Sequence, residues 1–338
     1  MAILKRLYPL LLAPILSGCY ETFTPDVDTT PVLCLNSLIT AGMPINVQVT
    51  HTWMFSDLNA GKNHAVRDAT VTIYVDGRPV ESNYIAREGD HVKIVADSPT
   101  YGHAEAEVTV PYGADIESVQ WEISDPSYFP TEAIPGYEIN TMMTFDINSK
   151  LTLADVPDTR NFYHMSFYGY DPAVEDDEPE ETKCDLYLGN LNYDSEPIFG
   201  EHIDAFETVM GSTSYGFDTF SDRSFANDKY TLQLNFSKFN YYVTSEKLDE
   251  RFFDCGFMMV LSTVSESYYN WCIYTWQHND GVLDDMAGMG FADALLPFSN
   301  VSTGAGVVAA QTQRTYTIPL DDYLERAVRN RPEPSPDF

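Results

Sequence analysis

The chain has few basic residues, and no long apolar run follows its first segment. It carries 19 Lys and Arg against 51 Asp and Glu, which gives a formal net charge of −32 at pH 7. A surface of this charge repels nucleic acid and anionic lipid, because phosphate groups are bound by clustered Lys and Arg. Beyond the start of the chain, no stretch reaches the roughly 18 uninterrupted apolar residues of a transmembrane helix. The composition therefore argues against a nucleic-acid partner and against a second membrane span.

Sequence motifs of common enzymes are also missing. There is no H-E-x-x-H, no G-x-S-x-G and no phosphate-binding loop, and residues 211–216 have the wrong spacing for a nucleophile elbow. The seven histidines are dispersed, and no C-x-x-C or Cys/His spacing predicts a zinc site. The sequence therefore indicates no catalytic residue, no cofactor and no metal ligand.

The strongest signal lies in the first nineteen residues. A short cationic segment precedes an apolar run at residues 7–16, which is too short to span a bilayer. Two small residues and then Cys19 follow the run. This pattern is typical of a bacterial lipoprotein signal, in which the cysteine is lipidated and becomes the first mature residue. The residues expected to be recognised by the signal peptidase are Leu16, Ser17 and Gly18. We expect residues 1–18 to be removed and Cys19 to hold the body to membrane lipid; the alternative is an ordinary secretory signal followed by a chance cysteine.

Composition predicts an all-β body. The chain has 22 Tyr, 19 Phe and 4 Trp, and its 19 Gly and 20 Pro punctuate it at short intervals. Residues 19–30 lack apolar periodicity and are expected to form a tether. Residues 31–112 contain about seven short apolar runs, as in an immunoglobulin-like or fibronectin-like β-sandwich. We expect residues 113–322 to form a larger β-rich domain with one helix, and residues 323–338 to form a C-terminal tail.

Individual strands are predicted where apolar residues alternate or run together. In the first domain these runs include residues 32–39, 45–50, 69–75, 91–96 and 104–110, with a hairpin turn at Asp76-Gly77 that leads to residues 78–80. In the second domain they are residues 141–148, 161–168, 229–236 and 256–261.

The one predicted helix begins near Ser265, where Thr263 to Glu266 has capping-box spacing, and continues through Gln277. Its aromatic residues cover too much of the helix circumference for a single stripe; they are Tyr268, Tyr269, Trp271, Tyr274 and Trp276. We interpret it as a helix wedged into the core of the second domain, and the alternative is a platform on which a ligand stacks.

Four cysteines remain after Cys19: Cys34, Cys184, Cys255 and Cys272. In an exported protein they allow two disulfides with three possible connectivities, or buried free thiols, since three of them lie in apolar surroundings. The acidic run at residues 175–181 is expected to be a solvated loop. Calcium binding is the alternative for this run, although it lacks the spacing of an EF-hand loop.

Four segments, in this order behind the signal, resemble the outer-membrane lipoproteins catalogued as domain of unknown function 4249 (DUF4249). They are residues 31–50, 69–77, 265–269 and 298–308. In the last segment, Gly304 and Gly306 predict a tight turn or a close backbone approach before the next strand. The resemblance covers nearly the whole mature chain and implies an outer-membrane accessory protein in bacteria that import nutrients through TonB-dependent β-barrels. It implies no catalytic residue, and it leaves the cell-surface and periplasmic faces both open.

We therefore expect a non-enzymatic lipoprotein that serves as a binding or assembly partner of a TonB-dependent transporter. Its partner surface is expected among loop aromatics, since Tyr and Phe are enriched in interface cores; these are Tyr128, Phe129, Tyr193, Phe199, Tyr215, Phe217 and Phe220. The alternative for these rings is packing within their own loops. Two other functions stay open, a surface adhesin or structural subunit and a surface glycan or peptide hydrolase.

Overall fold

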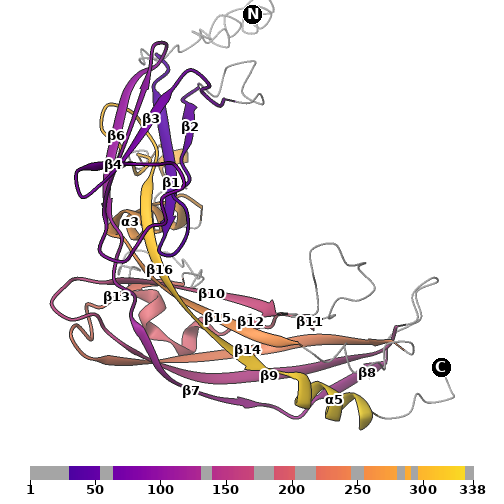
Figure 1. The fold of residues 1–338 in the computed structure, drawn as a ribbon. Coiled ribbons are helices and arrows are strands. Elements are labelled where there is room, and N and C mark those ends of the chain that lie inside the picture. The colour runs from indigo at the N-terminus through magenta and orange to yellow at the C-terminus, as the bar shows by residue number, and fades with distance from the viewer. Residues whose placement is uncertain are drawn as a thin grey trace, which may run out of the picture. The chain divides into compact units, whose positions relative to one another are not determined.

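The N-terminal sandwich consists of two groups of strands (Figure 1). The computed structural model describes residues 30–53, 64–130, 139–170, 186–201, 218–244, 255–279, 286–290 and 296–331. In the first group, β1 (Leu33–Thr40) pairs antiparallel with β2 (Gln48–His51). The second group is a sheet of order β4-β3-β5-β6, formed by β3 (Thr70–Val75), β4 (Arg78–Val80), β5 (His91–Ser98) and β6 (Gly102–Thr109).

The strands of this sandwich follow the alternation of the sequence. Leu33, Leu35 and Ile39 of β1 are buried and pack with Val92 and Ile94 of β5 in one core. Side chains of a strand alternate between its faces, so the intervening residues are exposed or half-buried. The predicted turn at residues 76–77 also forms, with both residues at positive φ. The sandwich predicted for the N-terminal part is therefore confirmed.

The remaining strands form two further layers around a second core. The first is part of a six-stranded sheet of order β13-β10-β15-β16-β1-β2, with β10 (Phe162–Tyr170), β13 (Thr219–Ser221), β15 (Gly256–Val264) and β16 (Val308–Pro319). The second layer is formed by β7 (Asp115–Ile123), β8 (Ser127–Pro130), β9 (Ile139–Ala154), β11 (Leu186–Tyr187), β12 (Asn190–Leu191) and β14 (Lys229–Thr244). Its strand order is β11-β14-β9-β7. In addition, β8 pairs with β9 and β12 pairs with β14. Aromatic side chains fill the space between these layers, among them Phe145, Phe239 and Phe257. This arrangement confirms the all-β prediction.

Strand β16 belongs to both cores. Its first residues pair in parallel with β1, from Ser37 opposite Val308 to Thr40 opposite Gln311, and Val308 and Ala310 are buried in the first core. Its later residues pair with β15, and Ile318 is buried in the second core. The N-terminal sandwich therefore extends beyond the predicted boundaries 31–112, because residues near 308 complete it. All these strands lie in one compact unit, Val32–Thr52 with Asn63–Phe338.

The segment before β16 joins the two groups of strands in the sandwich. Ser302 pairs with Glu105 of β6, and three residues later Ala305 pairs with Cys34 of β1. A Cβ atom on Gly304 would lie 2.5 Å from the Leu33 carbonyl oxygen. On Gly306, which has a φ of +110°, it would lie 2.1 Å from the Leu35 carbonyl oxygen. The close backbone approach predicted for these two glycines is therefore confirmed.

The described fold also has helical segments, among them the 3₁₀ turns η3 (Tyr193–Ser195) and η4 (Pro197–Gly200) and the helices α3 (Glu266–Asn279) and α5 (Asp321–Arg329). Helix α5 corrects the prediction of a tail at residues 323–338. Tyr323, Leu324 and Val328 lie on one side of it and are buried in the second core. Apolar residues three and four positions apart share a helix face. Residues 321–329 therefore form a helix packed on the second core and not an extended tail. Residues 332–338 lie outside the described part of the chain.

Candidate functional site

The structure corrects part of the predicted partner surface. Phe199 and Phe220 are fully buried, and their rings meet edge to face with centroids 5.7 Å apart. Tyr193 is half-buried and packs edge-on against Phe199. These rings fill the second core, because a loop that carries large apolar side chains is stabilised by burying them. None of the three is free to receive a partner.

The other predicted aromatics divide between packing and exposure. Tyr128 is half-buried, and its hydroxyl donates to the Ala327 carbonyl oxygen at 2.6 Å. Phe129, the next residue of β8, points to the opposite face and is exposed. Tyr215 and Phe217 lie outside the described residues. Phe129 therefore remains as the exposed member of this set in the part of the chain that is described.

Helix α3 and the neighbouring strand β10 carry exposed rings outside the predicted partner surface. Trp271 is 42% exposed, and its ring centroid lies 6.0 Å from that of Tyr268, three residues earlier on the helix. Tyr168 of β10 is 49% exposed. Tyr168 lies on the same face of β10 as Phe162 and His164, which both contact α3. We call Tyr168, Tyr268 and Trp271 the aromatic patch.

The position of α3 explains why these rings are accessible. The helix packs on the face of the six-stranded sheet opposite to the second core, with the Tyr269 ring 4.6 Å from Phe162 and the Tyr268 ring 5.5 Å from His164. Cys272 and Trp276 are its buried residues and form a small cluster of their own. The prediction of a helix wedged into the second core is therefore wrong. A helix that covers an outer sheet face has one exposed side, and Trp271 lies there.

Beneath the patch lies a group of buried polar side chains from β10, β13 and α3. His164 Nδ1 is 2.8 Å from the Thr219 hydroxyl, and the Cys272 thiol contacts both Thr219 and Tyr268. Burial lowers the pKa of His164 to about 4 and raises the pKa of Cys272 to about 11. Both groups are therefore uncharged at pH 7. A thiol of this pKa is about one part in ten thousand thiolate, so it is a weak nucleophile and a good packing group.

Two acidic side chains near β13, Glu201 and Asp218, have pKa values above their usual range. The Glu201 carboxylate accepts hydrogen bonds from the Ser221 backbone N–H and from the Tyr269 hydroxyl. Burial raises its pKa, although these hydrogen bonds lower it in part. Burial likewise raises the pKa of Asp218, one of whose oxygens is buried without a hydrogen-bond partner. Glu201 therefore lies beside α3, whereas Asp218 contacts Tyr193 of the second core.

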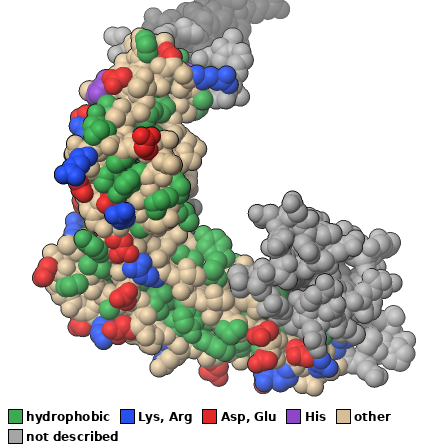
Figure 2. Space-filling model, in the orientation of Figure 1, with side chains coloured by type: hydrophobic (Ala, Val, Ile, Leu, Met, Phe, Trp, Pro, Cys, Tyr) green, Lys and Arg blue, Asp and Glu red, His purple; other side chains and the backbone are tan. Residues whose placement is uncertain are grey.

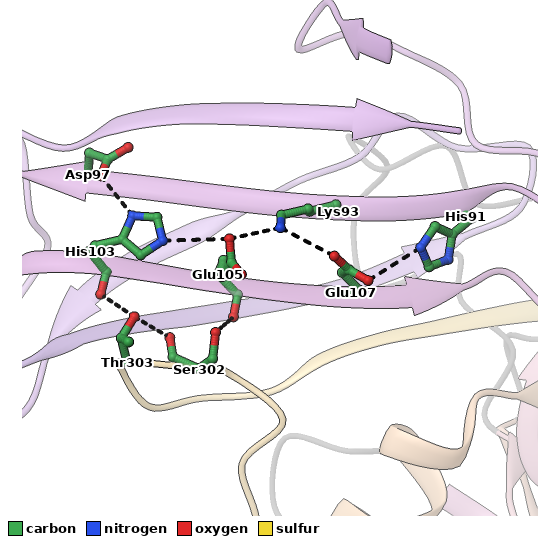
Figure 3. Close-up of polar contacts among 8 residues, drawn as sticks. All are labelled: His91, Lys93, Asp97, His103, Glu105, Glu107, Ser302 and Thr303. Carbon is green, nitrogen blue, oxygen red and sulfur yellow. Dashed lines mark hydrogen bonds and ion pairs between the residues drawn. The ribbon is translucent and has the colours of Figure 1, made fainter. Parts of the chain in front are cut away.

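A second polar assembly crosses β5 and β6 on the surface of the sandwich (Figure 3). Lys93 Nζ lies 2.8 Å from Glu105 and 3.3 Å from Glu107. His103 Nδ1 is 2.8 Å from Asp97, and this hydrogen bond is the main cause that raises the pKa of His103. Thr303 donates its hydroxyl proton to the His103 carbonyl oxygen. This hydrogen bond holds residues 302–306, the glycine segment that contains Gly304 and Gly306, at the edge of β6. Opposite charges on paired strands are weakly stabilising when they are solvated. These ion pairs therefore help to hold the edge strand β6 against β5.

Charged side chains of both signs are mixed on the described part of the surface that Figure 2 draws. On the face drawn in Figure 2, acidic side chains lie dispersed among basic and hydrophobic ones rather than in one block. Among the described residues, no group of three His, Cys, Asp or Glu is arranged to hold a metal ion. The acidic run at residues 175–181 lies outside the described part of the chain. Of the helices that the structure describes, none has the length and apolar character needed to cross a membrane.

The cysteines are in two chemical states. Cys34 and Cys272 are free thiols, whereas Cys255 is bonded in a disulfide. Cys184 lies outside the described residues. A disulfide at Cys255 is typical of a protein that folds in an oxidising compartment.

This pattern predicts the number of reactive thiols. In the chain from residue 19 onward carrying Cys19→Ser, we expect two thiols to react with a chromogenic disulfide in denaturant before reduction, and four after it. The double variant Cys34→Ser with Cys272→Ser should show none before reduction. Four reactive thiols in unreduced protein would contradict the assignment, and peptide mapping would identify the partner of Cys255.

Comparison with known proteins gives one match. The family model described as a domain of unknown function (DUF4249) matches residues 20–317. No curated protein and no solved structure matches the chain significantly. The matched range contains β1, the aromatic patch, the glycine segment and nearly all of β16. The chain therefore belongs to the DUF4249 family.

Proposed function

We propose that this protein is a lipid-anchored accessory of the bacterial outer membrane that binds a TonB-dependent β-barrel transporter. Support for the anchor comes from Leu16, Ser17 and Gly18 directly before Cys19, behind a cationic and apolar start. The disulfide at Cys255 fits a compartment outside the cytoplasm. Tethering restricts the body to the membrane surface, where an integral β-barrel is an abundant kind of protein partner.

The aromatic patch is the observation that carries the binding role. Trp and Tyr are the residues that contribute most often to binding free energy, when a partner covers them and excludes water. Here they stand on a helix and a strand that pack on each other, so little conformational entropy is lost when they are covered. The buried and uncharged side chains below give this platform a fixed shape. A binding surface needs such support more than it needs reactive groups.

Affinity purification of the lipidated protein in mild detergent tests the proposal. A TonB-dependent barrel should be recovered in nearly equal amount, and the double variant Tyr168→Ala with Trp271→Ala should lower its recovery about tenfold or more, since two hot-spot residues are lost. Trp121→Ala is the matched control, because Trp121 on β7 is 41% exposed and lies outside the patch. It should leave the recovery unchanged.

Three results would contradict the proposal. Recovery of the lipoprotein alone at low salt would exclude a stable complex, and binding to a cell-surface polymer would then favour an adhesin. Equal loss of the barrel in the Trp121→Ala variant would show that the aromatic patch is not the contact surface. Absence of the lipid on Cys19, read from the mass of the N-terminal peptide, would remove the anchor itself.

A further inference from the structure

The turn that follows β4 forms an open hollow on the N-terminal sandwich, away from the aromatic patch in sequence. Its volume is about 520 Å³, and it is lined by Pro79, Val80, Glu81, Asn83 and Tyr84. Sites that take small ligands or single side chains have volumes of roughly 300–1,000 Å³ and mostly apolar walls with a few polar groups. The volume of the hollow falls in this range, and three of its five lining residues are apolar or aromatic, but it is an open surface depression and not an enclosed pocket.

The wall of the hollow is fixed by hydrogen bonds. The Tyr84 hydroxyl donates to Asp90 Oδ2 at 2.9 Å, and the Arg87 backbone N–H donates to the same oxygen. The Tyr84 backbone N–H donates to the Glu81 carbonyl oxygen, which closes the turn. Asp90 is buried, and the Tyr84 ring packs on the first core. A ligand that enters the hollow therefore meets a wall that does not have to be ordered first.

The electrostatic surroundings favour a positive charge. The Glu81 carboxylate has no ion-pair partner among the described residues, unlike Glu88, which pairs with Arg314, and Glu117, which pairs with Lys229. The hydrogen bond to Asp90 is the main cause that raises the pKa of Tyr84; Asp76 adds to it, and Arg87 opposes it in part. Arg78 on β4 and Arg87 are the basic residues of the same hairpin and turn. Glu81 is the one charged residue among the five that line the hollow.

We propose that this hollow binds an arginine or lysine side chain presented by a polypeptide. The aliphatic stem would lie on Pro79, Val80 and Tyr84, and the cationic head would reach the Glu81 carboxylate and the Asn83 side-chain carbonyl. Long basic side chains bury their stems on apolar surface in this way while the charge remains near water.

Exposed apolar residues next to the hollow favour a polypeptide over a free amine. Ile85 follows Tyr84 directly, and its backbone is bridged to Pro44. Ile85 and Met43 are both exposed. The Ala86 backbone N–H donates to the Met43 carbonyl oxygen, so Met43 lies beside the residue that follows Ile85. Residues that flank a bound basic side chain would cover these two side chains. Burial of exposed apolar surface is the main source of affinity for such a segment.

Nuclear magnetic resonance titration tests this proposal on the chain from residue 19 onward carrying Cys19→Ser. The probe is the peptide acetyl-Leu-Ala-Arg-Ala-Leu-amide at about 150 mM salt, where nonspecific attraction to the acidic surface is screened. We expect shift changes centred on Val80 to Ile85. The same peptide with citrulline in place of arginine, which has the same shape without the charge, should bind about fivefold or more weakly.

Substitution of the acidic residue separates this site from general charge attraction. Glu81→Gln should weaken the arginine peptide about fivefold, whereas Glu122→Gln, which removes an exposed acid of β7, should not change its binding. Shift changes spread over the surface and unaltered by Glu81→Gln would overturn the proposal. Equal binding of the citrulline peptide, or stronger binding of a neutral oligosaccharide at the same resonances, would also overturn it. Neither outcome bears on the transporter complex, which is tested by different residues.

Discussion

Gly306→Ala is expected to cost about 4 kcal/mol or more of unfolding free energy, which is an unusually large loss for one methyl group. Two effects add at this position. A φ of +110° is unfavourable for any residue with a Cβ atom, and the new methyl carbon would lie 2.1 Å from the Leu35 carbonyl oxygen. The oxygen belongs to a central strand, so the clash is relieved only by moving β1 away from the segment that joins it to β6. Urea unfolding followed by circular dichroism measures the loss.

Three matched glycine variants separate the two effects. Gly42→Ala introduces a methyl group at a φ of +84° in open space, and we expect a loss of about 1 kcal/mol from backbone strain alone. Gly304→Ala places its Cβ 2.5 Å from the Leu33 carbonyl oxygen without a positive φ, so it reports the clash alone. Gly288→Ala meets nothing within 4 Å and should change stability by less than about 0.5 kcal/mol. A Gly306→Ala variant no less stable than Gly42→Ala would refute the close approach.

Leu324→Ala is expected to cost about 2–5 kcal/mol, because it empties a fully buried position in the second core. The helix that carries Leu324 is bound to the body by more than this side chain. Tyr323 donates its hydroxyl proton to the Ser124 carbonyl oxygen at 3.0 Å, and its ring lies 4.9 Å from that of Phe145. The same unfolding assay gives the loss, and near-ultraviolet circular dichroism should show weaker aromatic signals from this core.

A control on the same helix tests whether burial is the cause. Arg326 is exposed, and Arg326→Ala leaves the apolar face of α5 intact. We expect it to change the unfolding free energy by less than about 0.5 kcal/mol. Comparable losses for the two variants would mean that helix propensity, rather than packing against the second core, sets the effect.

Strands were predictable from the sequence where local pattern decides the structure. Residues 69–75 and 91–96 alternate apolar and polar side chains, and each forms a strand within one or two residues of the expected bounds. The parallel pairing of β1 with β16 was not predictable in this way. It joins residues such as Ser37 and Val308, whose separation along the chain leaves no local trace.

Helix α5 was missed because its start lacks a capping signal. Its N-cap residue is Leu320, whose side chain cannot accept a hydrogen bond from the first turn. The residues that follow the helix are rich in proline, so they offer no helical pattern of their own. The apolar spacing of Tyr323, Leu324, Ala327 and Val328 was the signal that could have identified the helix.

The candidate surface was harder to predict than the fold. Phe199 and Phe220 stand in segments without periodicity, where the sequence does not distinguish an exposed ring from one that folds back into the core. Tyr168 and Trp271 were both within correctly predicted elements. Their proximity depends on α3 packing across β10, which is a tertiary contact. Whether a ring is exposed is therefore set by packing partners that are distant in sequence.

The double membership of β16 has a consequence for the order in which the protein is made. The chain grows from its N-terminus, so β1 and β6 exist long before Ser302, Ala305 and Val308 arrive to pair with them. A ribosome that stops anywhere before those residues leaves an N-terminal sandwich with an open side and a second core without one of its central strands. Neither core can complete its packing before β16 is made. We therefore expect the folded body to resist proteases only after β16 has paired with β1 and β15.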